Sequence, residues 1–276
     1  KHRRRQRQMC IRDRSQRGNI FTNKNIVAVF IVFETPIGGE EKIIKIELLE
    51  ELNFTNMTPG KKFRDAIKNN SPLIIPGAIN AYSAKLAERA DHKAIYLSGS
   101  GVAAASYGLP DLGVTSLEDV VIDAKRITDA TNLPLLVDID TGWGGPEEIS
   151  NTIEEMENVG VAAVHIEDQV FDKRCGHRPN KQIVSVAEMQ DRIKAAVDAK
   201  KDESFFIMAR TDAFASEGIE KAIERCGEYL KVGADGIFFE AAISLNEYKE
   251  FNKNFSVPLL ANITAVSYTH LTLPTT

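Results

Sequence analysis

The chain has 276 residues and a formal net charge of −5, with 26% charged and 43% hydrophobic residues. This composition is typical of a folded globular protein, and its mildly acidic balance argues against nucleic-acid partners. Between Met57 and Thr264 the only thiols are Cys175 and Cys226, without CxxC spacing, which argues against disulfides and structural zinc and favours a reducing, cytoplasmic compartment.

The two ends of the chain do not fit the pattern of the rest. Residues 9–14 are what one DNA string would encode, and residues 266–270 are what its reverse complement would encode. A transposon end used to fragment DNA for sequencing has this inverted arrangement, so we expect residues 1–19 and 266–276 to be artefacts. Residues 20–56 contain one apolar run, too short to span a bilayer. We expect them to be translated upstream of a start at Met57, with native sequence outside the fold as the alternative, which leaves residues 57–265 as the domain.

Residues 57–265 alternate short apolar runs with amphipathic helical patterns. Thr58 and Pro59 supply a cap and a first-turn proline for a helix over residues 61–67. Near-continuous apolar strands separated by helices are typical of a parallel sheet. In chain order we expect strands at residues 73–76, 94–97, 133–137, 162–166, 205–209, 236–239 and 258–261, and helices near residues 82–90, 117–131, 147–159, 186–199, 218–232 and 245–252.

Polar residues follow nearly every predicted strand. They include Ser98, Asp138, Glu167, Arg210 and Glu240. A (β/α)8 barrel builds its site from the carboxyl ends of many strands in this way. An open doubly wound sheet would concentrate such residues at one switch point, with a glycine-rich first turn that this sequence lacks. We therefore expect an α/β fold of the TIM-barrel type, cut short after its seventh strand.

The basic loop at residues 173–181 carries Cys175 among cations and beside Gly176 and His177. Nearby cations favour the thiolate, and glycine lets a bound anion approach the backbone. The alternative, a free cysteine that fills a gap in the core, conflicts with the charged residues on both sides of the sulfur. We therefore expect this loop to take part in the chemistry.

Asp138 and Asp140 lie two residues apart at the end of one predicted strand, so their side chains point the same way. Carboxylate oxygens are the ligands that Mg2+ prefers. The alternative is that this pair caps the helix that follows. We expect the pair to hold Mg2+.

Several motifs together resemble the isocitrate lyase and phosphoenolpyruvate mutase superfamily, from about residue 58 to residue 264. They are YLSG at 96–99, LPD at 109–111, VDIDTG at 137–142, HIEDQ at 165–169, KRCGHRPNK at 173–181, ARTD at 209–212 and ANIT at 261–264. Within the superfamily the similarity is greatest to the lyases that cleave 2-methylisocitrate. The resemblance implies a Mg2+-dependent carbon–carbon lyase that splits this small tricarboxylate into pyruvate and succinate in propionate breakdown, and a homotetramer that exchanges helices between neighbours. It implies neither a nucleic-acid nor a membrane partner.

The resemblance also implies roles in metal binding and proton transfer. Asp111 and Glu167 become outer ligands of the Mg2+ held by the aspartate pair, each through a water molecule. Cys175 is the acid that protonates the succinate carbanion as its loop closes over the site. Tyr96 is a candidate base, with an ordinary buried strand tyrosine as the alternative.

The remaining motif residues are expected to bind substrate. Arg210 grips a carboxylate and the carbonyl oxygen and is oriented by Glu240, the alternative being a structural ion pair. Family members more often have glycine at the position of Ser100. The expected substrate-binding set is Ser98, Gly99, Ser100, Gly176, His177, Arg210, Glu240, Asn262 and Thr264, with plain loop capping as the alternative for Asn262 and Thr264.

Two further residues are expected to be structural, and two further functions stay open. We expect His165 to be a hydrogen-bonded core residue and Cys226 to be packing, while Phe238 is a candidate for the pocket around the substrate methyl group.

The near alternatives to this function are other superfamily reactions, such as isocitrate cleavage or the hydrolysis or decarboxylation of oxaloacetate. The alternative from a different class is a catalytically silent barrel that serves in binding or assembly.

Overall fold

A computed structural model describes residues 57–173, 180–242 and 244–262. The expectations for residues 1–19, 20–56 and 266–276 lie outside the described residues. The chain divides into two compact units, residues 1–57 and 58–276, and the account below concerns the second.

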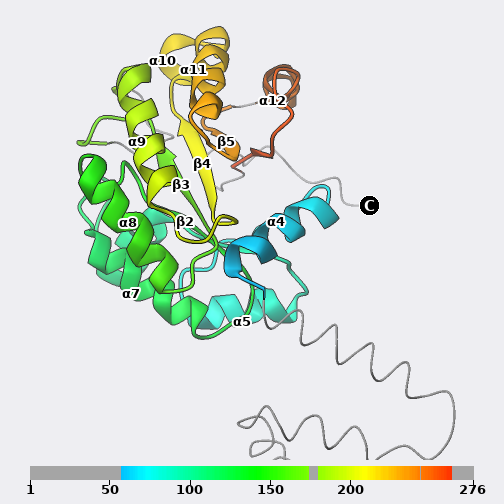
Figure 1. The fold of residues 1–276 in the computed structure, drawn as a ribbon. Coiled ribbons are helices and arrows are strands. Elements are labelled where there is room, and N and C mark those ends of the chain that lie inside the picture. Colours follow the sequence, from blue (N-terminus) through cyan, green and yellow to red (C-terminus); the bar gives the residue numbers. More distant parts are fainter. Residues whose placement is uncertain (1–56, 174–179, 243, 263–276) are drawn as a thin grey trace, which may run out of the picture. The chain divides into compact units, whose positions relative to one another are not determined.

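Six parallel strands form one curled sheet within the described residues (Figure 1). The strands pair in chain order, each with the next, as expected when every crossover turns the same way around the sheet. This order confirms the α/β class and is unlike that of a doubly wound sheet, in which the order reverses at a switch point. The strands are β1 (Ile95–Leu97), β2 (Leu135–Asp138), β3 (Ala163–Glu167), β4 (Phe206–Thr211), β5 (Gly236–Phe239) and β6 (Leu259–Leu260).

The first predicted strand, at residues 73–76, is reduced to a single bridge. Gly77 pairs with Tyr96 in parallel, through Tyr96 N to Pro76 O at 3.0 Å and Ala78 N to Tyr96 O at 2.8 Å. The next bond of this ladder would have to come from the backbone nitrogen of Pro76, which carries no hydrogen. Proline thus stops the pairing that the apolar run predicts.

Helices join successive strands, and in Figure 1 α7, α8, α9 and α11 lie side by side along one side of the sheet. The expected helices are found with their ends shifted by three residues or fewer. Three short helical segments were not predicted: α6, η1 and α10. In chain order the helices are α4 (Pro59–Asn69), α5 (Ala81–Arg89), α6 (Gly99–Gly101), η1 (Val102–Ser106), α7 (Leu117–Thr128), α8 (Pro146–Asn158), α9 (Val186–Ala199), α10 (Phe214–Glu217), α11 (Ile219–Lys231) and α12 (Leu245–Asn252).

The two faces of the sheet bury different sets of side chains. Alternate strand residues such as Val137, Val164 and Ile237 belong to a large apolar cluster shared with the covering helices. The residues between them, such as Leu136 and Met208, belong to a smaller cluster on the inner face. Side chains alternate across a strand, so this pattern decides which polar residues at the strand ends also point inward.

Helix α4 covers one end of the inner face. Thr58 Oγ1 accepts from Lys61 N at 3.2 Å and Pro59 occupies the first turn, as the sequence predicts. Phe63 packs edge-on against Phe206, with ring centroids 5.4 Å apart, and Arg64 Nε donates to Ser204 O at 2.7 Å just before β4. This end of the sheet is therefore filled with apolar side chains, and polar groups gather at the opposite end.

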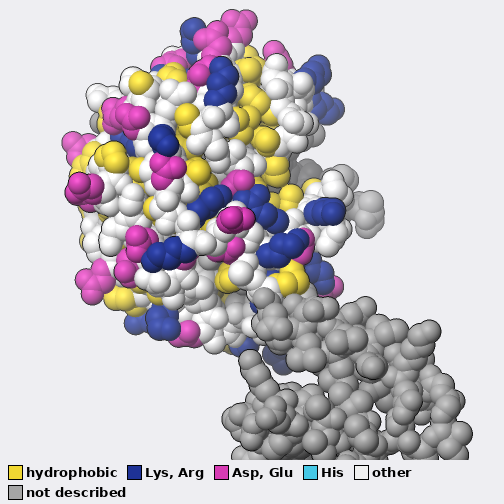
Figure 2. All heavy atoms as spheres, viewed as in Figure 1, with side chains coloured by type: hydrophobic (Ala, Val, Ile, Leu, Met, Phe, Trp, Pro, Cys, Tyr) yellow, Lys and Arg dark blue, Asp and Glu magenta, His cyan; other side chains and the backbone are white. Residues whose placement is uncertain are grey.

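The surface carries charges of both signs, intermixed on the face shown in Figure 2. Many of them pair within helices, as Lys194 does with Asp198 at 2.8 Å. Exposed pairs of this kind contribute only about 0.3–0.5 kcal/mol each, so the apolar clusters must supply most of the stability. Among the described helices, none is long and apolar enough to cross a membrane.

Candidate active site

Polar residues on the inner face meet where β2, β3 and β4 end. Asp138 on β2 is in register with His165 on β3, and Glu167 on β3 is in register with Arg210 on β4. All four are buried. The inner face therefore has apolar residues at one end of the strands and ionisable residues at their carboxyl ends.

Three carboxylates form a buried acidic cluster, Asp138, Asp140 and Glu167. One ligand atom from each lies within 4.8 Å of the others. Asp138 is fixed by two backbone donors, Gly99 N to Oδ2 and Asp140 N to Oδ1, both at 3.1 Å. A Cβ at Gly99 would lie 3.2 Å from oxygens of both aspartates, so glycine there lets the backbone approach closely.

Two oxygens of this cluster accept no hydrogen bond although they are buried, Asp140 Oδ1 and Glu167 Oε2. Each has only an ion-pair contact, with Lys173 and Arg210 respectively. Buried carboxylate oxygens are normally satisfied by donors. Hard oxygens inside a buried acidic cluster, balanced only by these ion pairs, suit a hard divalent cation such as Mg2+, so these residues fit the ion that the sequence predicts.

The three acids differ in pKa. Burial would raise the pKa of Asp138, but His165 and the neighbouring cations outweigh burial and hold it below its usual range. Burial and the charge of Asp138 raise the pKa of Asp140 to about 7, and burial raises that of Glu167 well above its usual value. A bound dication would favour the ionised form of all three.

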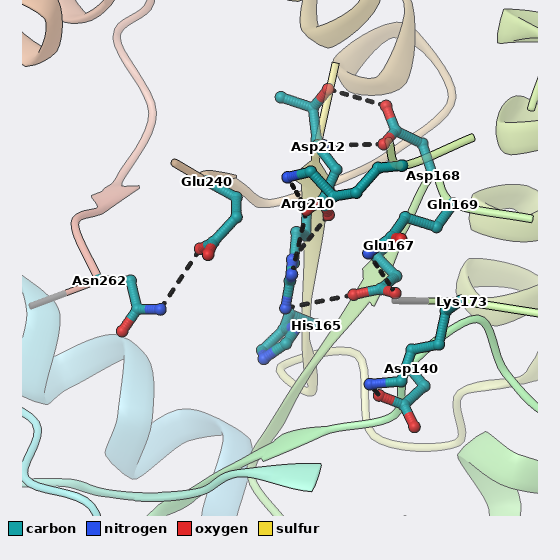
Figure 3. Close-up of polar contacts among 12 residues, drawn as sticks. Asp140, His165, Glu167, Asp168, Gln169, Lys173, Arg210, Asp212, Glu240 and Asn262 are labelled. Atoms are coloured by element: carbon teal, nitrogen blue, oxygen red, sulfur yellow. Dashed lines mark hydrogen bonds and ion pairs between the residues drawn. The ribbon is translucent and has the colours of Figure 1, made fainter. Parts of the chain in front are cut away.

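Lys173 places a buried ammonium group beside the acidic cluster. Its Nζ contacts Asp140 (Figure 3). The same Nζ lies 2.8 Å from Asp111 Oδ1. Burial would lower the pKa of Lys173, but the surrounding carboxylates raise it above its usual value. The described contact of Asp111, the predicted outer ligand, is therefore with Lys173, and Asp111 is not part of the acidic cluster.

Arg210 is held from several sides. Nε and Nη2 donate to Asp212 Oδ2 and Oδ1 at 2.9 and 3.2 Å, and Nη1 lies 3.2 Å from Glu167 Oε2 (Figure 3). Its guanidinium carbon lies 5.0 Å from the centre of the Phe238 ring. Glu240, which was expected to orient Arg210, accepts at Oε2 from Asn262 Nδ2 at 3.3 Å.

Tyr96, which is partly buried, and His165, which is fully buried, form a pair on the inner face. Tyr96 Oη lies 3.0 Å from His165 Nε2, and that nitrogen is 3.7 Å from Asp138 Oδ1. Burial and nearby cations lower the pKa of His165 to about 4, and burial followed by the charge of Asp138 raises that of Tyr96 well above its usual value. His165 is thus a buried, hydrogen-bonded residue, as expected, and both groups are neutral at pH 7.

The predicted substrate-binding residues lie partly inside and partly outside the described residues. Ser98 Oγ and Ser100 Oγ are 2.8 Å apart after β1, next to Gly99 and its contact with Asp138. The expectations for Cys175, Gly176, His177 and Thr264 lie outside the described residues. Cys226, expected to be packing, is a buried free thiol on α11.

Sequence reasoning missed three residues of the site, Lys173, Lys181 and Asp212. Lys181 Nζ donates to Asp212 Oδ1 at 2.7 Å, and both side chains are buried. The two-residue spacing from Arg210 to Asp212 was a signal of the kind used for the aspartate pair. Lys173 and Lys181 open and close the basic loop motif, but a lysine in a polar loop gives no local sign that it will be buried against a carboxylate.

Comparison with known proteins identifies the family of this chain. The phosphoenolpyruvate phosphomutase family matches residues 63–274. The 2-methylisocitrate lyase of Shewanella oneidensis is 60% identical over 212 residues, which are 77% of this chain and 73% of that protein. This chain belongs to the 2-methylisocitrate lyase family. The Escherichia coli member of the family is 55% identical over 215 residues, 78% of this chain and 73% of that protein.

Solved structures place the 2-methylisocitrate lyase family among related enzymes. A 2,3-dimethylmalate lyase, titled a member of the PEP mutase/isocitrate lyase superfamily, has a TM-score of 0.70 at 35% identity and covers 74% of this chain and 69% of its own. A phosphonopyruvate hydrolase solved with oxalate and Mg2+ has a TM-score of 0.67 at 31% identity and covers 78% of this chain and 75% of its own. These likenesses extend across the curled sheet that carries the site.

Proposed function

We propose that this protein cleaves 2-methylisocitrate into pyruvate and succinate, with Mg2+ as cofactor. The observation that carries the proposal is a buried cluster of three carboxylates next to a fixed arginine, at the carboxyl ends of parallel strands. The 60% identity to a 2-methylisocitrate lyase supports the choice of substrate.

The Mg2+ would be held by Asp138, Asp140 and Glu167. Asp111, which contacts Lys173, would be an outer ligand through a water molecule. Two of the three clustered acids have raised pKa values, so binding the ion displaces protons that burial favours. Mg2+ there would supply positive charge for the oxygen that becomes the carbonyl of pyruvate.

The chain's own residues would bind the carboxylates of the substrate. Arg210 is held by Asp212 through two hydrogen bonds, which leaves other N–H groups of its guanidinium to donate to a carboxylate. Ser98 and Ser100 bring hydroxyl groups, and Asn262 brings an amide fixed by Glu240. From the sequence, Gly176, His177 and Thr264 complete the set.

Cleavage requires one proton to leave the substrate hydroxyl and another to reach the carbanion. We assign the first transfer to Tyr96, whose O–H is placed to pass its proton to neutral His165 as it accepts one from the substrate. The electrons of the broken carbon–carbon bond remain on the succinate fragment, which takes its proton from Cys175.

The remaining proposals follow from the family. The six-strand sheet would be part of an eight-stranded barrel, the intact protein would form a homotetramer, and the enzyme would serve propionate breakdown in the cytoplasm. Phe238 packs against both Arg210 and His165, with its ring 4.9 Å from the imidazole, which supports the proposal that it contacts the substrate methyl group.

Product analysis tests the proposed function. The protein is incubated with 2-methylisocitrate in Mg2+ or in EDTA, and the products are identified by NMR. We expect equal amounts of pyruvate and succinate in Mg2+ and none in EDTA. Cleavage that is equally fast in EDTA, or a lack of either product in Mg2+, would contradict the proposal.

A further inference from the structure

One carboxylate, Asp212, is shared by two buried cations. Its Oδ2 accepts from Arg210 Nε at 2.9 Å, and its Oδ1 accepts from both Arg210 Nη2 at 3.2 Å and Lys181 Nζ at 2.7 Å. The side chains of Asp212, Lys181 and Arg210 are 0%, 2% and 8% exposed. Figure 3 shows Asp212 beside Arg210, on the far side from Asp140.

Lys181 is held in place by the backbone on which it sits. Val170 N donates to Gln182 O at 3.0 Å and Val184 N donates to Asp168 O at 2.9 Å. The segment that follows Lys181 is therefore tied to the chain that leaves β3. The backbone next to Lys181 is thus already ordered, so pairing with Asp212 costs only the rotamer freedom of the lysine side chain.

Asp212 is held just as firmly, through its backbone. Its N–H donates to Asp168 Oδ1 at 2.8 Å, and Asp168 Oδ2 accepts from Thr211 Oγ1 at 2.7 Å and Tyr229 Oη at 2.8 Å. Neither Lys181 nor Arg210 can move away from Asp212 without breaking a buried ion pair, which is costly. The three groups thus act as one fixed charge arrangement.

Charge counting gives this arrangement a function. Arg210 and Asp212 alone would be a neutral pair, and Glu167 on the other side of Arg210 would reduce its attraction for an anion further. Lys181 adds one positive charge, so Arg210, Asp212 and Lys181 keep a net charge of +1, and their sum with ionised Glu167 is zero instead of −1. We propose that Lys181 is a positioning residue that preserves the anion-binding strength of Arg210 by sharing Asp212 with it.

This inference rests on the proposed function for the identity of the substrate, but not for the binding of an anion at Arg210. Oxalate serves as the probe, because a solved relative carries it together with Mg2+. Calorimetric titration of oxalate into the Mg2+-loaded protein measures the affinity without any cleavage.

The first variant removes the second cation. Lys181→Met keeps the length of the side chain and should weaken oxalate binding at least about tenfold, since a unit charge about 10 Å from an anion is worth roughly 1.7 kcal/mol at an effective dielectric constant of about 20. Mg2+ affinity should change by less than about threefold. The matched control is Lys194→Met, which removes an exposed lysine paired with Asp198 and should leave both affinities unchanged.

The double variant Lys181→Met with Asp212→Asn separates a charge effect from a folding effect. It removes one charge of each sign and leaves Arg210 as the net +1, so it should bind oxalate more tightly than Lys181→Met alone. A merely structural lysine predicts wild-type affinity for the folded Lys181→Met protein, and that result would overturn the inference. If Lys181→Met does not fold, a double variant that binds oxalate more than about tenfold more weakly than the wild type would overturn it as well.

Steady-state cleavage keeps this test distinct from that of the proposed function. In a wild-type enzyme that cleaves 2-methylisocitrate, Lys181→Met should raise KM much more than it lowers kcat, because the carboxylate is bound both before and during the reaction. A wild type that does not cleave this substrate contradicts the proposed function and leaves the oxalate titration to decide the role of Lys181.

Discussion

Asp140 combines an unfavourable position with a required function. Burial and the charge of the neighbouring Asp138 together raise its pKa to about 7. Its Oδ1 accepts no hydrogen bond and has only the ion-pair contact with Lys173. A folded-state pKa above the unfolded value means that ionised Asp140 destabilises the metal-free protein at pH 7. Binding of a dication turns the same charge into a favourable one.

A substitution at this position should therefore separate stability from metal binding. Asp140→Asn removes the unfavourable charge, so the metal-free protein should melt at an unchanged or higher temperature. The rise in melting temperature that Mg2+ causes in the wild type should be lost, because one anionic ligand becomes neutral. Thermal unfolding with and without Mg2+ measures both effects, and Asp129→Asn on the surface is the control. A full Mg2+ response in Asp140→Asn would remove this residue from the metal site.

Tyr96 is the second residue whose role can be isolated. Tyr96→Phe keeps the ring on the inner face and deletes only the hydroxyl bonded to His165. If that hydroxyl transfers the substrate proton, kcat should fall about 100-fold or more while KM stays within a few-fold of the wild type. Turnover close to that of the wild type would show that Tyr96 is an ordinary strand tyrosine.

The candidate site was predictable where the local sequence determines the direction in which a side chain points. Asp138 ends β2 and Arg210 lies near the end of β4, so strand alternation alone brings these two to the inner face. Asp140 comes after β2 with φ +48°, so the turn, and not strand alternation, sets its position. Lys173 and Lys181 could not be placed in this way, because their partners Asp111, Asp140 and Asp212 are 31 to 62 residues away in the chain. Their positions depend on how the basic loop packs against segments that are distant in the sequence.

Among the helices, α4 packs closely against the start of β4 because one of its residues, Gly60, has no side chain. A Cβ at Gly60 would lie 2.5 Å from the backbone nitrogen of Phe205, where neither group has room to move. Gly60→Ala should therefore destabilise the protein by about 1–3 kcal/mol through overpacking. Urea unfolding measures the change.

Gly227 on α11 supplies the matched control for this substitution. Its Cβ would meet nothing within 4 Å, so Gly227→Ala should stabilise the protein by about 0.5–1 kcal/mol through helix propensity. Equal effects of the two substitutions would mean that α4 does not pack against the start of β4 as described.

The helices and strands themselves were predictable, with one instructive exception. Apolar runs with helical patterns between them located all six strands of the sheet within a few residues. The run at residues 73–76 satisfied the same pattern, yet Pro76 removes the donor that a second bridge to β1 would need. A run of apolar residues is therefore not enough for a strand, which also requires a backbone hydrogen at each alternate position.

At the scale of the whole described domain, sequential strand order gives every strand the same inner face. Apolar inner residues pack near α4, and ionisable ones meet at the opposite end. A fold of this kind places catalytic groups on a rigid sheet and leaves specificity to the segments after the strands. One scaffold can therefore serve several reactions, as the names of the related structures indicate.

The central claim is that this site acts on 2-methylisocitrate, and a comparison of specificity constants tests it most directly. Values of kcat/KM are measured in Mg2+ for 2-methylisocitrate, isocitrate, 2,3-dimethylmalate and oxaloacetate. One methyl group in an apolar pocket is worth about 1–3 kcal/mol, so the account predicts at least a tenfold preference for 2-methylisocitrate over isocitrate and a larger one over the other two. An equal or higher kcat/KM for any of the three competitors would contradict it.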